Sequence, residues 1–145
     1  MNFNKIELAY CGLYCLQCSF RTTSETNNRK HLESMPERYD AKKAMTNEEC
    51  ACEGCKGENV CGPCDIQDCA VDRNLVSCAD CNEFPCSYIT RFENDGVPHH
   101  YQGIQNLRMI QENGYEAWFQ EYKENLQCSK CGARQSWYYM CDNHT

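Results

Sequence analysis

The sequence is poor in the residues that normally build a hydrophobic core. Leu, Ile, Val and Phe together make up about 14% of the 145 residues, a fraction typical of chains that bury too little apolar surface to fold unaided. A chain of this length can otherwise bury roughly two thirds of its surface around one core. The length therefore allows one domain with a small appendage, and another source of stability is required.

Two further absences concern location and partners. The first residues do not show the basic segment followed by an apolar run that is typical of a secretory signal. No stretch approaches the ~18 apolar residues of a membrane helix. We therefore expect a cytoplasmic protein with no membrane partner. The 14 Lys and Arg are scattered among 21 Asp and Glu, and the formal net charge is -7. Because phosphate backbones repel an acidic chain, the sequence argues against nucleic acid and leaves an unknown protein partner or small molecule.

Cysteine is the residue present in excess, with 15 copies. In a reducing compartment this density favours metal ligation over disulfides, and the odd number prevents complete pairing. Pairs separated by two residues suit a tetrahedral metal because a short turn presents both thiolates, and glycine relieves the backbone of that turn. One spacing occurs twice at an offset of 17, in Cys61-x2-Cys64-x4-Cys69 and Cys78-x2-Cys81-x4-Cys86, which indicates two related units.

Together with one histidine, the cysteines make sixteen candidate ligands, enough for four closed zinc sites. One set stands alone near the carboxyl end and consists of Cys128, Cys131, Cys141 and His144. The other twelve candidates are Cys11, Cys15, Cys18, Cys50, Cys52, Cys55, Cys61, Cys64, Cys69, Cys78, Cys81 and Cys86. Spacing alone does not group these twelve, because loops of this class interleave. We expect three or four zinc ions per chain.

The remaining histidines, His31, His99 and His100, are spare imidazoles that could replace a thiolate. A lone histidine in a polar stretch is more often exposed to solvent than bound to a metal. We therefore expect all three side chains to be exposed.

Outside the cysteine clusters, hydrophobic periodicity predicts short helices over residues 16–34, 65–73, 85–93 and 99–112. An aromatic stripe then predicts a further helix with a buried face, formed by Tyr115, Trp118, Phe119, Tyr122 and Leu126. Residues 137–139 are typical of a short strand. The sequence thus predicts a small, metal-stapled α+β fold of short helices and irregular zinc-knuckle loops, ending in a zinc-ribbon-like hairpin. Residues 1–112 would form a cysteine-rich metal-binding domain, and residues 113–145 an aromatic helix and knuckle packed on it.

Several cysteine motifs follow one another in a specific order. They are Ala9-Tyr10-Cys11-Gly12-Leu13-Tyr14-Cys15 with Cys18, then Cys52-Glu53-Gly54-Cys55, then Cys61-x2-Cys64-x4-Cys69-Ala70, and Cys78-x2-Cys81 leading into Glu83-Phe84-Pro85-Cys86. Over about residues 8 to 112 this set resembles the bacterial and archaeal family of unknown function numbered 3795. The resemblance implies a small cysteine-rich, zinc-binding domain and no known reaction. The family pattern leaves Cys50 as an extra, and without Cys50 one site would hold three thiolates and an open position.

These features favour a multi-zinc binding or scaffold module in which metals replace the missing core. The role is more consistent with a non-catalytic protein than with an enzyme, because no acid-base or nucleophile constellation occurs outside the thiols. One alternative is an iron-sulfur protein for electron transfer or enzyme assistance, with Cys11, Cys15 and Cys18 as cluster ligands. A soft-metal storage or transfer protein is another alternative. Such a protein needs little packed core, however, whereas this sequence predicts helices with aromatic faces.

Overall fold

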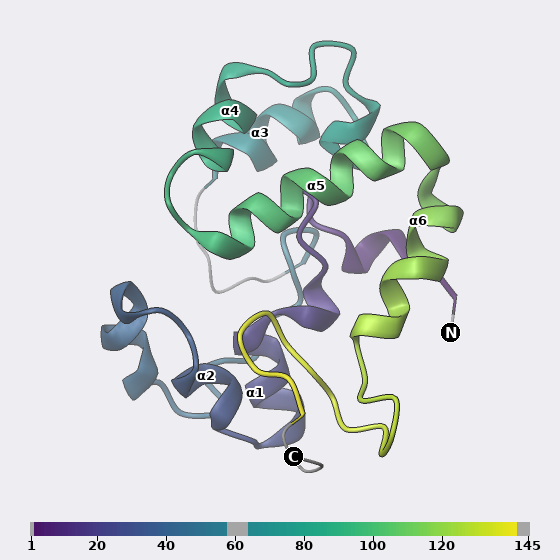
Figure 1. Ribbon diagram of the computed structural model, residues 1–145. Helices are drawn as coiled ribbons and strands as arrows, with labels where there is room; N and C mark the ends of the chain where they lie inside the picture. The colour runs from purple at the N-terminus through teal and green to yellow at the C-terminus, as the bar shows by residue number, and fades with distance from the viewer. Residues whose placement is uncertain (1, 58–63, 142–145) are drawn as a thin grey trace.

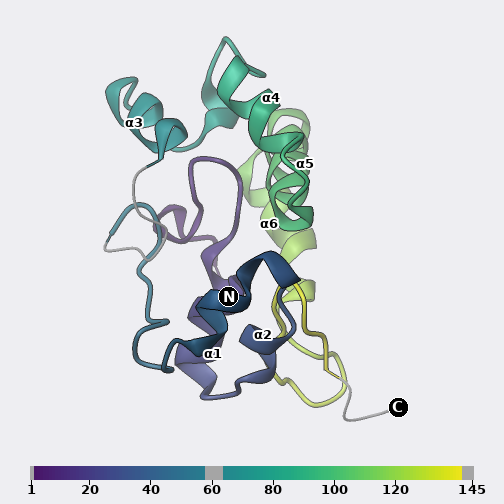
Figure 2. The same ribbon diagram turned by 90° about the vertical axis from the view of Figure 1, so that its left-hand side faces the viewer.

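Short helices joined by irregular loops make up the computed structural model, which describes residues 2–57 and 64–141. The longest helix, α5, lies between α3 and α4 on one side and α1 and α2 on the other (Figure 1; Figure 2). The α-helices are α1 Ser19–Thr26, α2 Lys30–Glu33, α3 Asp65–Asp72, α4 Ser87–Glu93, α5 Pro98–Asn113 and α6 Tyr115–Tyr122. The 3-10 helices are η1 Lys5–Glu7, η2 Cys15–Gln17, η3 Glu37–Ala44, η4 Cys78–Asp80 and η5 Lys123–Asn125. Within the described ranges, no helix is long and apolar enough to cross a bilayer.

The helix expected over residues 16–34 is divided into η2, α1 and α2. Asn27 ends α1 in the left-handed conformation, with φ 57°, and its backbone N–H donates to the Thr23 carbonyl at 2.9 Å. Asparagine accepts this conformation more readily than other residues, so it terminates the helix. The helices expected elsewhere are present, with α5 and α6 separated by Gly114.

The described part of the chain is mostly helical, with little of the β structure that the α+β expectation included. Among the residues described, β structure consists of three isolated bridges: Leu8 with Tyr14, Gln127 with Arg134, and Ser136 with Tyr139. The strand expected at residues 137–139 is instead a turn between the bridged Ser136 and Tyr139. Both central residues of this turn, Trp137 and Tyr138, pack toward the same apolar cluster, an arrangement that the alternating faces of a strand would not allow.

Apolar packing is distributed over three small clusters. The first confirms the buried aromatic stripe of α6 and contains Leu8, Tyr14, Ile110, Trp118, Phe119 and Leu126. The second lies between α3, α4 and α5 and contains Ile66, Ala70, Cys78, Ile89, Ile104 and Leu107. The third lies beneath α1 and α2 and contains Cys18, Phe20, Leu32, Met35 and Cys50. Three candidate ligands belong to these clusters: Cys78 to the second, and Cys18 and Cys50 to the third.

A close backbone approach fixes the first cysteine loop against α5. Gly12 has φ +92°, and a Cβ placed on it would lie 2.0 Å from the carbonyl oxygen of Gly103. The Asn106 side chain, one turn further along α5, donates to the Gly12 carbonyl oxygen at 2.9 Å. Glycine at this position therefore allows the loop and the helix to touch.

Two buried histidines hold the C-terminal loop on the rest of the molecule, so the expectation that they are exposed was wrong. His31 is 1% exposed, and its Nδ1 is hydrogen-bonded to Ser136 Oγ at 2.6 Å. His99 is 5% exposed, and its Nδ1 is hydrogen-bonded to the Tyr138 hydroxyl at 2.7 Å. These partners come from a loop far away in sequence, and they satisfy imidazoles that would otherwise prefer water. The third histidine, His100, is half-buried beside Asp95.

Stability should decrease as the pH falls below 6.5. Burial lowers the pKa of His31 to about 4 and that of His99 to about 3, from an ordinary 6.5. The unfolded chain therefore binds more protons than the folded one between these values, and folding is disfavoured as the pH falls through this window. When the pH falls from 7 to 5, protonation of His31 in the unfolded chain should lower the free energy of unfolding by about 2 kcal/mol.

Urea unfolding of the wild type and of His31→Gln at these two pH values measures this contribution. Glutamine can keep the hydrogen bond to Ser136 but does not titrate, and any acid effect on the cysteines is common to both proteins. Equal pH dependence in the two proteins would show that His31 is not held neutral by the fold.

Candidate metal centres

The C-terminal cysteines form the tightest candidate metal centre. The Sγ atoms of Cys128, Cys131 and Cys141 all lie within 4.8 Å of one another. Cys131 Sγ and Cys141 Sγ are 3.7 Å apart. A tetrahedral zinc ion with Zn–S bonds of about 2.3 Å would hold two sulfur atoms about 3.8 Å apart. These three thiols thus fit zinc, whereas the fourth expected ligand, His144, lies outside the described residues.

A turn in the backbone presents the first two of these thiols. Gly132 adopts φ +76°, and its N–H donates to the Cys128 carbonyl at 2.8 Å, while the Cys128 N–H donates to the Ala133 carbonyl at 2.7 Å. The backbone N–H groups of Lys130 and Cys131 also donate to the Cys128 sulfur, which lowers its pKa to about 6. The thiolate form required for metal binding is therefore available at neutral pH.

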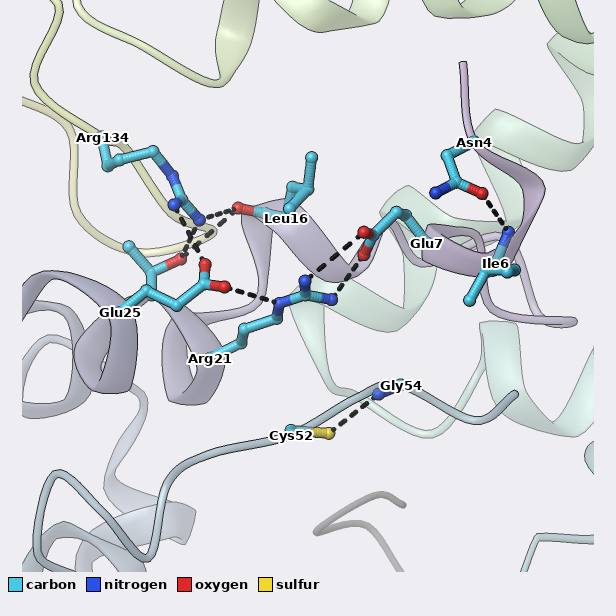
Figure 3. Close-up of polar contacts among 10 residues, drawn as sticks. Asn4, Ile6, Glu7, Leu16, Arg21, Glu25, Cys52, Gly54 and Arg134 are labelled. Carbon is cyan, nitrogen blue, oxygen red and sulfur yellow. Dashed lines mark hydrogen bonds and ion pairs between the residues drawn. The ribbon is translucent and has the colours of Figure 1, made fainter. Parts of the chain in front are cut away.

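An arginine in the loop ties this cysteine turn to the amino-terminal half (Figure 3). The Arg134 guanidinium donates to Glu25 at 3.0 Å and to the Leu16 carbonyl at 2.8 Å. Arg21 pairs with Glu25 at 3.2 Å and with Glu7 at 2.5 Å, so the two arginines share one carboxylate. The C-terminal centre is thereby positioned beside α1 and η2.

A second group surrounds a cavity of about 20 Å³ between α3 and α4, which Cys69, Cys78, Cys81 and Cys86 line. Burial raises the pKa of Cys78 to about 12, with further contributions from the other three thiols and Cys64. Arg73, which sequence analysis did not single out, donates to Cys81 Sγ at 3.6 Å. The three cysteines of the second repeat unit, and Cys69 of the first, therefore line the same cavity.

A third group brings together two pairs of matching spacing, Cys15 with Cys18 and Cys52 with Cys55. Burial raises the pKa of Cys15, and the neighbouring Cys18, Cys55 and Cys52 raise it further. A Cβ on Gly54 would lie 2.6 Å from Cys15 Sγ, and the Gly54 N–H donates to Cys52 Sγ at 3.4 Å (Figure 3). Gly54 therefore lets the second pair approach the first.

Cys55 also lies near a fourth group that includes Cys11 and Cys64. The N–H of Tyr10 donates to Cys55 Sγ at 3.4 Å. Burial raises the pKa of Cys11, and Cys55, Cys64 and Cys78 raise it further. Cys55 thus lies between the third and fourth groups, and the remaining expected ligand of this region, Cys61, lies outside the described residues.

The upstream groups are more open than the C-terminal centre. Across residues 2–57 and 64–141, three or more candidate ligand atoms lie mutually within 4.8 Å only at Cys128, Cys131 and Cys141. The three thiols considered for an iron-sulfur cluster, Cys11, Cys15 and Cys18, thus do not form a site for a single metal ion. The turn at Gly12 directs the chain of Cys11 toward α5 and separates it from the other two.

Cys50 differs from the other upstream cysteines in its surroundings. It is fully buried in the third apolar cluster, beside Phe20 and Leu32. Burial raises its pKa, and the charges that act on it belong to Arg29 and Glu49 rather than to other thiols. Such a site suits a small apolar side chain, since free cysteine is among the most buried residue types.

No disulfide joins the cysteines in the part of the chain that the structure describes. Comparison with known proteins gives a match to the family model described as "Protein of unknown function (DUF3795)" over residues 7–91, which confirms the resemblance seen in the cysteine motifs. Searches of curated proteins and of solved structures found no match. Because the matched residues make up more than half of the sequence, the chain belongs to the DUF3795 family.

Proposed function

We propose that this protein is a non-catalytic binding or scaffold module in which three or four thiolate-bound zinc ions replace an extended hydrophobic core. The spacing of Cys128, Cys131 and Cys141, which matches the sulfur spacing of tetrahedral zinc, is the observation that carries the proposal. The division of the apolar residues into three small clusters supports it, because each cluster alone buries little. Thiolate ligation also suits a reducing compartment such as the cytoplasm.

The cysteine groups suggest how the ligands divide among the ions. His144 would complete the C-terminal set. The four thiols around the small cavity, Cys69, Cys78, Cys81 and Cys86, would form a second, closed set. The third group, which contains Cys15, and the fourth group, which contains Cys11, would bind the remaining ions. Cys61 would belong to the fourth group, and Cys55 lies between the two groups. A zinc ion held by four protein ligands has no open position, so its contribution is to cross-link the loops.

Replacement of single cysteines tests whether these groups bind metal. We expect Cys131→Ser to lower the zinc content by about one ion per chain, because a serine hydroxyl is a poor substitute for a thiolate ligand. Cys50→Ala is the control and should retain all the zinc of the wild type, because it keeps a small apolar side chain in the third cluster. Native mass spectrometry of both variants and the wild type gives the number directly.

The proposal fails if Cys131→Ser binds as much metal as the wild type. A brown protein containing iron and sulfide would instead support the iron-sulfur alternative. Uptake of many loosely held ions would support metal storage.

A further inference from the structure

Residues of α5, α6, the segment that follows α6 and the C-terminal loop line a cavity of about 620 Å³. We call it the trough. Its volume falls within the roughly 300–1,000 Å³ typical of ligand sites, and no cysteine of the described residues lines it. Tyr101 and Met140 stand at its edges with 47% and 53% of their surface exposed. Its wall adjoins the C-terminal centre, because Met140 directly precedes Cys141.

Buried polar side chains give the trough a fixed floor. Trp118 Nε1 donates to Asn106 Oδ1 at 3.1 Å, and the Asn106 amide nitrogen donates to the Gly12 carbonyl at 2.9 Å. Gln17 accepts a hydrogen bond from the Tyr122 hydroxyl. The floor groups satisfy one another and are held in place before any ligand arrives. A bound molecule would find its polar contacts on the walls instead.

The walls combine exposed carboxamides with aromatic and methionine side chains. Gln102 and Gln105 on α5 and Asn125 after α6 are exposed, and each carries both donors and an acceptor. An extended peptide has backbone N–H and C=O groups that require such partners, whereas a helix satisfies its own. Tyrosine, tryptophan and methionine are enriched in the centres of protein interfaces. The wall chemistry therefore favours an extended polypeptide segment.

Charge limits the kind of segment further. Glu121, an exposed residue of α6, lines the trough. The positive charge of Arg108 is already matched by Glu93, at 2.7 Å and 3.0 Å. The whole chain carries a formal net charge of -7, so basic groups on a partner would be attracted.

We propose that the trough binds an extended segment of a partner protein, with apolar side chains at its centre and Lys or Arg on its flanks. This inference rests on the proposed function as a binding module and names its docking surface. The apolar side chains would pack against Tyr101, Trp137 and Met140, and the carboxamides would pair with the backbone of the segment.

Selection from a random twelve-residue peptide library displayed on phage, with the zinc-loaded full-length protein as bait, tests the proposal. We expect the selected peptides to be basic and apolar and to bind more weakly in high salt. Tyr101→Ala and Gln105→Ala should each weaken binding about tenfold, the loss typical of an interface hot spot. Val71→Ala, which removes an exposed apolar side chain from α3, should bind like the wild type.

Failure to select any peptide, or selected peptides whose affinity is unchanged in both trough variants, would overturn the proposal. Self-association of the free chain that Tyr101→Ala abolishes would also overturn it, because a second copy would then occupy the trough. Zinc content measured on the same samples distinguishes failure of this proposal from failure of the proposed function. A folded, zinc-loaded protein that binds no peptide would contradict only the docking surface.

Discussion

Removal of the proposed zinc ions by a strong chelator should unfold the protein. We expect the helical circular dichroism signal to fall and the cooperative thermal transition to disappear. A structural zinc site contributes an apparent binding free energy of roughly 10–16 kcal/mol, whereas a whole domain is stable by only about 5–15 kcal/mol. Each of the three apolar clusters holds only five or six buried residues, too few to compensate for this loss.

Addition of zinc to the stripped, reduced protein should restore both signals, which excludes damage by the chelator. Cadmium, which also prefers thiolates, should restore them as well, whereas magnesium should not. A metal-free protein with an unchanged spectrum and melting temperature would show that the apolar clusters suffice without metal.

Gly12→Ala should destabilise the protein by more than about 3 kcal/mol, or prevent folding, because it combines two costs. The residue has φ +92°, a conformation that alanine adopts poorly. Its new Cβ would also collide with the Gly103 carbonyl, a backbone atom that moves only if α5 moves. Urea unfolding measured with zinc present gives the change in free energy.

Gly96→Ala is the matched control for this prediction. Gly96 has φ +84°, close to that of Gly12, but no heavy atom lies within 4 Å of the position of its Cβ. The control therefore has only the backbone cost, about 1 kcal/mol. Equal losses for the two variants would mean that the contact of the first cysteine loop with α5 contributes nothing.

Local sequence patterns predicted the helices well. The spacing of Ile104, Leu107 and Ile110 places these residues on one face of α5, and all three are buried in the structure. The aromatic stripe likewise became the buried face of α6. The Cys128 and Cys131 pair was also predictable, because ligands so close in sequence meet in a single turn.

Contacts between distant segments could not be predicted in this way. His31 and Ser136 are separated by 105 residues, and no periodicity links them, so the histidine looked like an exposed polar residue. Similarly, Cys11 and Cys15 are close in sequence but join different groups, because the Gly12 turn lies between them. The grouping of ligands depends on such turns and on loop packing, which spacing does not reveal.

The central claim, that thiolate-bound zinc holds this fold together, is tested most directly by native mass spectrometry of the anaerobically purified, folded protein together with its absorption spectrum. The account predicts a colourless protein that carries three or four zinc ions per chain. A folded chain with no bound metal, or one with iron and visible absorption, would contradict it.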